Sequence, residues 1–342
     1  MIQQALARLL DGHDLGRNES REVMDSIMRG EATPAQIGGF LIALRLKGET
    51  ADEIAGCAEA MREHVLPVRP QREDLVDTAG TGGDGAKTIN ISTAAALVAA
   101  AAGAGVAKHG NRAVSSSSGS ADVLEALGFE LELPAERIAR SIDELGFGFL
   151  FAPTHHPAMR HAAPVRRELG ARTVFNVLGP LTNPAGARAQ VVGVYAPELV
   201  RTIAEVLAQL GARRAFVVHG AEGIDELSPA GPNLVCEVVD GTVRERTIDP
   251  STELGVPRCD PAELRGGSPD ENAAAIRAVF AGENSGRRSA ILLNAAGAIA
   301  AGGHAADLRE GLGYAREAVD SGAAGQRLEE LIAFSRSEEA VA

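Results

Sequence analysis

The chain has 342 residues, of which 45% are hydrophobic, and it contains no Trp. This length exceeds one domain of roughly 100 to 200 residues, so a large domain with a smaller one is expected. A formal charge of −13, from 33 Lys and Arg against 46 Asp and Glu, repels nucleic acid and anionic membranes at long range. Three scattered Cys without metal or disulfide spacing indicate a reducing compartment. The chain also lacks a signal-peptide pattern and a membrane span, so we expect a cytoplasmic protein.

Residues 1–70 predict a small all-helical domain. Apolar residues recur there at helical spacing, and Thr precedes two of the expected helix starts. The expected helices are 2–10, 20–28, 34–45 and 51–65. No strand pattern interrupts them.

Residues 71–342 predict a large α/β domain, in which a central, mostly parallel sheet is flanked by helices. Short apolar runs alternate there with helical patterns, as in sheets built with crossover helices. The expected strands are 75–78, 106–109, 148–151, 190–195 and 215–219. The expected helices are 93–102, 121–127, 135–145, 157–169, 198–210, 271–281, 290–301 and most of 307–334.

A glycine-rich loop follows the first expected strand, where residues 77–93 read DTAGTGGDGAKTINIST. Its G-x-G-x-x-G pattern suits a dinucleotide fold, but the helix begins too late and the next strand ends in Lys108 instead of an acidic residue. A phosphate-binding P-loop is also disfavoured, because Ala86 interrupts the required Gly-Lys-Thr sequence. The loop instead predicts close backbone approach to an anionic ligand. Asn90, Ser92 and Thr93 then serve as helix caps and as ligand contacts.

A second anion-binding loop is predicted over residues 108–122, which read KHGNRAVSSSSGSAD. It combines cations, hydroxyls and a helix start, a set of groups that favours phosphate or pyrophosphate. A solvated polar loop is the alternative reading.

Seven ordered motifs resemble anthranilate phosphoribosyltransferase, and the similarity runs nearly from end to end. They are DTAGTGGD (77–84), NIST (90–93), KHGNR (108–112), GSADVLEALG (119–128), HPAM (156–159), VRRELG (165–170) and FNVLGPLTNP (175–184). The resemblance implies transfer of a phosphoribosyl group from phosphoribosyl pyrophosphate to the amine of anthranilate, a step of tryptophan biosynthesis. It also implies Mg²⁺, two ions per subunit, and a homodimer whose small helical domain is completed by residues 165–185.

The resemblance implies that both loops bind the phosphoribosyl donor. The residues concerned are Gly80, Gly83, Asp84, Thr88, Asn90, Ile91, Ser92, Thr93, Lys108, His109, Gly110, Asn111, Arg112, Ser115, Ser116 and Ser120. The resemblance also covers GIDELS (223–228) and implies that Asp225 and Glu226 are magnesium ligands, with Ser92 as a further oxygen ligand. Outside that motif, this acidic pair would be read as solvated surface.

For the acceptor, the resemblance implies that Arg166 binds the anthranilate carboxylate, although it also fits an exposed helix face. Asn111 orients the amine and His109 lines the pocket, whereas His155 and His156 shape a loop. Lys108, His109, Asn111 and Arg166 thus position the substrates, and no acid or base is assigned.

One departure from the family concerns Ser117, which stands where many relatives carry a lysine. It puts donor affinity in doubt, but Lys108, Arg112 and the metal remain. Two rivals stay open: a pyrimidine nucleoside phosphorylase, which has a similar fold, and a non-catalytic nucleic-acid-binding relative, which the negative charge disfavours.

Overall fold

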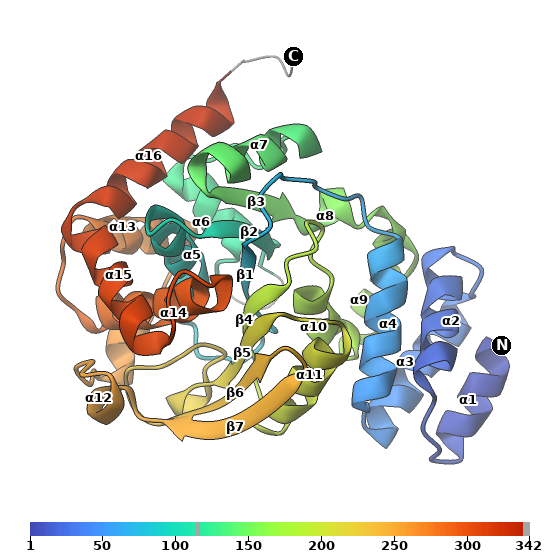
Figure 1. Ribbon diagram of the computed structural model, residues 1–342. Coiled ribbons are helices and arrows are strands. Elements are labelled where there is room, and N and C mark those ends of the chain that lie inside the picture. Colours follow the sequence, from blue (N-terminus) through green and yellow to red (C-terminus); the bar gives the residue numbers. More distant parts are fainter. Residues whose placement is uncertain (114–116, 338–342) are drawn as a thin grey trace.

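The computed structural model describes residues 1–113 and 117–337. A bundle of helices at the N-terminus stands beside a larger part, in which helices cover both faces of a seven-stranded sheet (Figure 1). This architecture confirms the expected α/β class, with a small helical part and a large part built on a mostly parallel sheet. Within the described residues, no helix has the length and hydropathy needed to span a bilayer.

The N-terminal helices begin where the sequence places polar caps. Thr33 and Thr50 each accept a hydrogen bond from the backbone N–H three residues on, and the side chains of Gln36 and Glu53 accept bonds from the cap N–H groups in return. These reciprocal bonds satisfy amide groups that a helix start otherwise leaves unpaired. The helices are α1 (Ile2–Leu10), α2 (Arg17–Met28), α3 (Pro34–Lys47) and α4 (Ala51–Glu63).

The sheet has the strand order β3-β2-β1-β4-β5-β6-β7, with parallel pairing from β3 to β5. All five expected strands are present. They are β1 (Leu75–Gly80), β2 (Gly105–Gly110), β3 (Phe147–Phe151), β4 (Ala189–Gly193) and β5 (Arg214–His219).

An antiparallel hairpin that the sequence analysis did not predict extends the sheet. It consists of β6 (Asn233–Val239) and β7 (Thr242–Ile248). The two connecting residues, Asp240 and Gly241, both have positive φ, of 44° and 81°. Asp-Gly is a favoured pair for such two-residue turns.

Most helices of the α/β part also match the expected segments, but residues 157–169 do not form one helix. A 3₁₀ turn, Pro157–His161, precedes a separate helix α9 that begins just before Pro164. Proline suits the first turn of a helix, where its missing N–H costs nothing, and Pro164 lies in the first turn of α9. The helices are α5 (Ile91–Ala101), α6 (Ser120–Leu127), α7 (Ala135–Leu145), α8 (Ala152–His155), α9 (Ala163–Leu169), α10 (Phe175–Leu178), α11 (Glu198–Gln209), α12 (Pro250–Glu253), α13 (Pro269–Phe280), α14 (Gly286–Gly302), α15 (Leu308–Asp320) and α16 (Ala323–Arg336).

Alternating strand residues enter two different cores. Val191 and Phe216 join the core that contains α5 and α14, whereas Val192 and Val217 join a second core with α11. Side chains alternate between the faces of a strand, so each face requires its own cover. The second core also contains apolar residues of α1 to α4, and therefore the N-terminal bundle and one face of the sheet share it.

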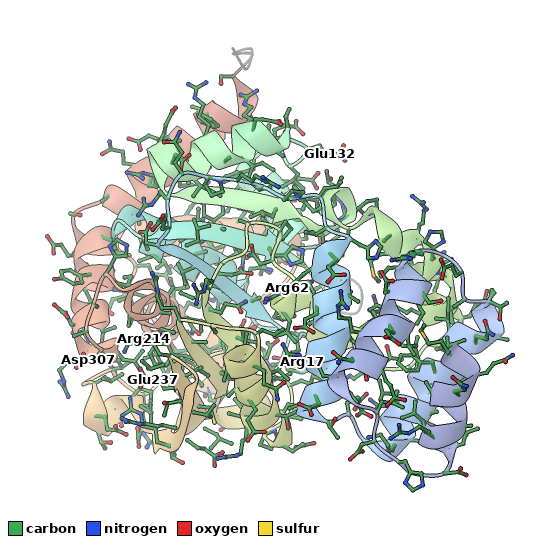
Figure 2. All side chains as sticks on the ribbon, turned by 45° about the vertical axis from the view of Figure 1, so that its right-hand side comes forward. Arg17, Arg62, Glu132, Arg214, Glu237 and Asp307 are labelled. Atoms are coloured by element: carbon green, nitrogen blue, oxygen red, sulfur yellow. The ribbon has the colours of Figure 1, made fainter. Side chains whose placement is uncertain are left out.

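Two arginines reinforce the junction between the bundle and the rest of the molecule (Figure 2). Arg62 of α4 donates to the carbonyl oxygen of Leu181 at 2.7 Å, and Arg17 of α2 donates to the carbonyl oxygen of Gln209 at 3.3 Å. Polar bonds and apolar packing therefore fix the bundle to the same neighbours.

Glu53 is a buried carboxylate whose loss should destabilise the bundle. It accepts the Leu15 N–H at 2.9 Å and the Lys47 ammonium at 3.0 Å, and it is 0% exposed. We expect Glu53→Ala to lower the free energy of unfolding by about 3 kcal/mol, because it leaves the buried Leu15 N–H without its acceptor and removes one of the two carboxylates that pair with Lys47. Urea denaturation followed by circular dichroism measures this loss.

The matched control is Arg201→Ala, which removes an exposed ion pair to Glu205 on α11. Exposed pairs contribute little, so the control should change the free energy of unfolding by less than about 0.5 kcal/mol. An equally small change for Glu53→Ala would contradict the role assigned to that carboxylate.

Candidate active site

Most of the predicted site residues gather at the carboxyl ends of the parallel strands. The glycine-rich loop follows β1, the second loop follows β2, and the acidic loop 220–227 follows β5. Ligands of open α/β sheets bind at this edge because the connecting loops converge there. The predicted Ser115 and Ser116 lie outside the described residues.

The glycine-rich loop lies against the acidic loop. The Gly82 N–H donates to Asp225 Oδ2 at 2.7 Å, and a Cβ on Gly80 would stand 2.3 Å from the same oxygen. A Cβ on Gly193, at the end of β4, would stand 1.4 Å from the backbone oxygen of Asp225. Glycine at these strand ends is therefore required for the approach of the acidic loop.

Three carboxylates meet beside the glycine-rich loop. Oxygen atoms of Asp84, Asp225 and Glu226 lie within 4.8 Å of one another, and Oε2 of Glu226 is buried without a hydrogen-bond partner among the described residues. Burial and neighbouring negative charge raise the pKa of Asp225 to about 6 and raise the pKa of Glu226 well above its ordinary value. Asp84, expected as a donor contact, thus belongs to the same cluster as the two expected metal ligands.

Ser92 lies beside this cluster, as its expected role as a metal ligand requires. Ser92, Asp225 and Glu226 line one small cavity, together with Thr78 and Asn294. The three oxygen-bearing side chains therefore face a common space.

Lys108 places a buried cation next to the same space. Its ammonium donates to the Thr78 carbonyl at 2.5 Å and lies 3.5 Å from Ser92 Oγ. Burial lowers the pKa of Lys108 to about 8, and the negative charges of Asp77 and Glu226 partly counter that effect.

Asp77 supports the second loop from inside the sheet, a role that the sequence analysis missed. Its carboxylate accepts the His109 N–H at 3.1 Å and the Asn183 side-chain amide at 2.8 Å. Burial raises the pKa of Asp77 to about 6. Asp77 thereby joins β1, the end of β2 and the turn around Asn183.

His109 and His156 form a buried pair of neutral rings. Their Nε2 atoms are 3.1 Å apart, and His109 Nδ1 lies 3.1 Å from the Gly179 carbonyl oxygen. That carbonyl can only accept, so His109 carries its proton on Nδ1 and accepts from His156 through Nε2. Burial lowers the pKa of His109 to about 3 and that of His156 to about 4. His155 separately faces the Leu66 carbonyl at 2.9 Å.

The start of α5 differs from the sequence expectation, because Asn90 forms no side-chain cap. Its amide instead bonds to Ser118 and Asn272.

The other predicted residues near this helix start differ in what they leave open to a ligand. The Ile91 side chain enters the main core, so only its backbone remains for ligand contact. The hydroxyl of Thr93 is buried without a partner among the described residues. Thr88 pairs with Arg265 through the backbone.

In the second loop, Ser120 bonds to the backbone of Asn111, and Arg112 pairs with carboxylates of the protein itself. The Ser120 hydroxyl donates to the Asn111 carbonyl at 3.2 Å, and a Cβ on Gly110 would stand 2.2 Å from that hydroxyl oxygen. The Arg112 guanidinium donates to Glu125 at 2.7 Å and also pairs with Asp122. Two carboxylates of α6 therefore compete with phosphate for Arg112, whose expected phosphate contact stays a prediction.

Arg166 holds a guanidinium without a carboxylate partner among the described residues. It lies 4.9 Å from the ring centroid of Phe175, and burial lowers its pKa. Arg172, which the sequence analysis missed, donates to the Gly83 carbonyl and lies 4.1 Å from the ring centroid of Tyr195. The segment that carries Arg166 thus reaches the glycine-rich loop through Arg172.

Known proteins match both parts of the chain. A glycosyl transferase family α/β domain model matches residues 72–325, and a glycosyl transferase family helical bundle domain model matches residues 3–65. Anthranilate phosphoribosyltransferase from Anaeromyxobacter sp. (strain Fw109-5) is 57% identical over 336 residues, which cover 98% of this chain and 99% of the relative.

Solved structures agree with these matches. Anthranilate phosphoribosyltransferase from Thermus thermophilus superposes with a TM-score of 0.92 at 51% identity, covering 97% of this chain and 99% of the other. The Saccharomyces cerevisiae enzyme in complex with PRPP and Mg superposes with a TM-score of 0.87 at 30% identity, covering 98% and 97%. These findings confirm the resemblance carried by the seven motifs: the chain belongs to the anthranilate phosphoribosyltransferase family.

Proposed function

We propose that the chain transfers the phosphoribosyl group of phosphoribosyl pyrophosphate to the amine of anthranilate. The products are N-(5-phosphoribosyl)anthranilate and pyrophosphate, and the step serves tryptophan biosynthesis. The observation that carries the proposal is the meeting of a glycine-rich loop, a buried lysine and a cluster of three carboxylates at one edge of the sheet. Relatives named for this activity support it.

The donor is assigned to the two loops. Backbone amides around Gly80 and Gly83, the hydroxyls of Ser92 and Ser120, and the Lys108 ammonium surround its charged ends. Fixed amides and cations stabilise the charge that develops on departing pyrophosphate without reorganising during the reaction. The assigned donor residues are Gly80, Gly83, Asp84, Thr88, Asn90, Ile91, Ser92, Thr93, Lys108, Gly110, Ser115, Ser116 and Ser120.

The residues present fit magnesium. Asp225, Glu226 and Ser92 offer the oxygen ligands that this cation prefers, and the unpartnered Glu226 Oε2 is a buried acceptor suited to a cation. Burial and mutual repulsion raise the pKa values of Asp225 and Glu226, and a bound cation would favour their charged forms. When bound, Mg²⁺ supplies charge neutralisation to the pyrophosphate group. We assign two ions per subunit by extension from the family resemblance.

The acceptor is assigned to the segment that runs from α9 through α10 to Gly179. Arg166 can hold the anthranilate carboxylate through paired hydrogen bonds, and Asn111 orients the amine. Arg172 joins this segment to Gly83, and Gly179 joins it to His109, so the segment is fixed to both donor loops.

The protein does not need a strong base for this reaction. The aromatic amine of anthranilate is neutral near pH 7 and attacks as pyrophosphate leaves the anomeric carbon, so alignment of the two substrates is the main contribution. Both ring nitrogens of His109 are engaged and its pKa is lowered to about 3, which suits a wall of the pocket better than a general base.

We further propose the organisation that the resemblance implies. Residues 1–70 form the small domain, residues 165–185 complete it, and residues 71–342 otherwise form the donor-binding domain. The membership of Val165 and Phe175 in the core of α1 to α4 supports this division. The active unit is a cytoplasmic homodimer.

Turnover by the purified protein tests the proposed reaction. Phosphoribosyl pyrophosphate, Mg²⁺ and anthranilate should give loss of anthranilate fluorescence with release of pyrophosphate. Phosphate with thymidine or uridine should release no free base. The reverse pattern would assign the chain to nucleoside phosphorolysis.

Replacement of Arg166 tests the acceptor site. Arg166→Ala should raise the KM for anthranilate by about 100-fold and the KM for the donor by less than threefold, because it removes a paired contact to a carboxylate. Arg167→Ala is the matched control, since Arg167 is the exposed neighbour on the same helix and should leave both constants unchanged. Equal effects of the two variants would remove Arg166 from the acceptor site.

Replacement of Glu226 tests the carboxylate cluster without measuring activity. Burial raises the pKa of this group, so its ionisation costs stability as pH rises above the pKa of the unfolded chain. In metal-free buffer at pH 7, Glu226→Gln should increase the free energy of unfolding by about 1 kcal/mol, with a smaller gain near pH 5. Denaturant titrations at the two pH values measure the difference.

Glu237→Gln is the control for this experiment, because Glu237 pairs with Arg214 at 2.8 Å across β5 and β6 (Figure 2). It should leave the stability unchanged or lower it. Adding Mg²⁺ should stabilise the wild type and the control, but not Glu226→Gln. A destabilised Glu226→Gln at pH 7 would contradict a carboxylate cluster that lacks its cation.

A further inference from the structure

A buried amide on α13 lies behind the start of α5. Asn272 is 1% exposed, and it stands 182 positions along the chain from Asn90. Its Oδ1 accepts the Gly267 N–H at 2.8 Å, and its Nδ2 donates to Asn90 Oδ1 at 2.9 Å. No motif of the sequence analysis contains Asn272.

The orientation of both amides follows from a single backbone group. The Gly267 N–H can only donate, so the Asn272 oxygen must face it and the Asn272 nitrogen must face Asn90. Asn90 therefore presents its oxygen to Asn272 and its nitrogen to the Ser118 carbonyl, at 3.1 Å. The Ser118 hydroxyl completes the arrangement by donating to Asn90 Oδ1 at 3.1 Å. A chain of oriented groups thus runs from α13 to the end of the second loop.

The backbone around Asn272 is itself fixed to the first loop. The Ile89 N–H donates to the Leu264 carbonyl at 2.9 Å, and the Gly266 N–H donates to the Lys87 carbonyl at 2.8 Å. A Cβ on Gly266 would stand 2.6 Å from Asn272 Oδ1 and 2.7 Å from the Thr88 carbonyl oxygen. Segment 264–272 is therefore packed too closely against residues 87–90 for the amide of Asn272 to turn freely.

We propose that Asn272 is a positioning residue for the phosphoribosyl donor. It holds Asn90 so that Asn90 joins the helix start after the first loop to the end of the second loop. The two anion-binding loops thereby keep the spacing that the charged ends of the donor require. The inference rests on the proposed function, because that function supplies the ligand that spans both loops.

Three variants separate this role from simple support of α13. Asn272→Ala removes the whole amide. Asn272→Asp keeps an oxygen that accepts the Gly267 N–H but loses the N–H group that donates to Asn90. Ser141→Ala is the control. It removes a buried hydroxyl that donates to the Phe147 carbonyl at 2.7 Å, on α7 and away from both loops.

The expected result is a selective loss of affinity for the phosphoribosyl donor. Both Asn272 variants should raise the KM and the Kd for phosphoribosyl pyrophosphate by about tenfold, because they release the spacing of its contacts. The KM for anthranilate and kcat at saturating donor should stay within about twofold. Ser141→Ala should keep the wild-type donor constants even where its melting temperature falls as far as that of Asn272→Ala.

A double-mutant cycle tests whether Asn272 acts through Asn90. Asn90→Ala should raise the donor KM, and adding Asn272→Ala should raise it no further. The inference would be overturned if the effects of the two substitutions on the donor KM multiplied in the double variant. It would also be overturned if both Asn272 variants kept the wild-type KM and Kd for the phosphoribosyl donor. Absence of turnover by the wild type would instead refute the proposed function, so the two failures are distinguishable.

Discussion

The site depends on the close approach of one acidic loop to the ends of two strands. Asp225 lies where a Cβ on Gly80 or Gly193 would have to stand, and the Gly82 N–H holds its carboxylate there. A larger residue at either strand end would displace Asp225, and Glu226 with it. The glycines that mark this family in sequence therefore make room for the protein's own carboxylates as well as for a phosphorylated ligand.

The ionisable groups at this edge of the sheet lower the stability of the fold when no ligand is bound. Three carboxylates meet in a confined space, one of their oxygens has no partner among the described residues, and the nearby Lys108 has a pKa lowered to about 8. Isolated buried charges are costly, and proteins retain such arrangements where a ligand or ion relieves them. Asp77 lies within β1, where hydrogen bonds from His109 and Asn183 satisfy its carboxylate. It therefore supports the second anion-binding loop and is not part of the three-carboxylate cluster.

The sequence predicted the local elements well, because strands, helix starts and glycine turns are encoded over a few residues. The five parallel strands and the helical N-terminus followed from that periodicity. The β6–β7 hairpin was missed although Asp240-Gly241 is a recognisable turn, because β7 reads TVRERTI, with three consecutive charged residues, and is mostly exposed. Arg112 was expected to face phosphate, but Glu125 on the next helix competes for it. Asn272 could not be found in this way, because its partner Asn90 is adjacent only in the folded chain.

The shared core of the N-terminal helices has a consequence for how the molecule divides. Two family models split the chain near residue 70, yet Met24 of α2, Leu44 of α3 and Leu207 of α11 belong to one continuous apolar cluster. A fragment cut at that point would expose the apolar face of α11 to water and lose the Arg62 bond to Leu181. The two family models thus divide the chain at a point that the apolar cluster crosses, and cooperative unfolding should follow the cluster.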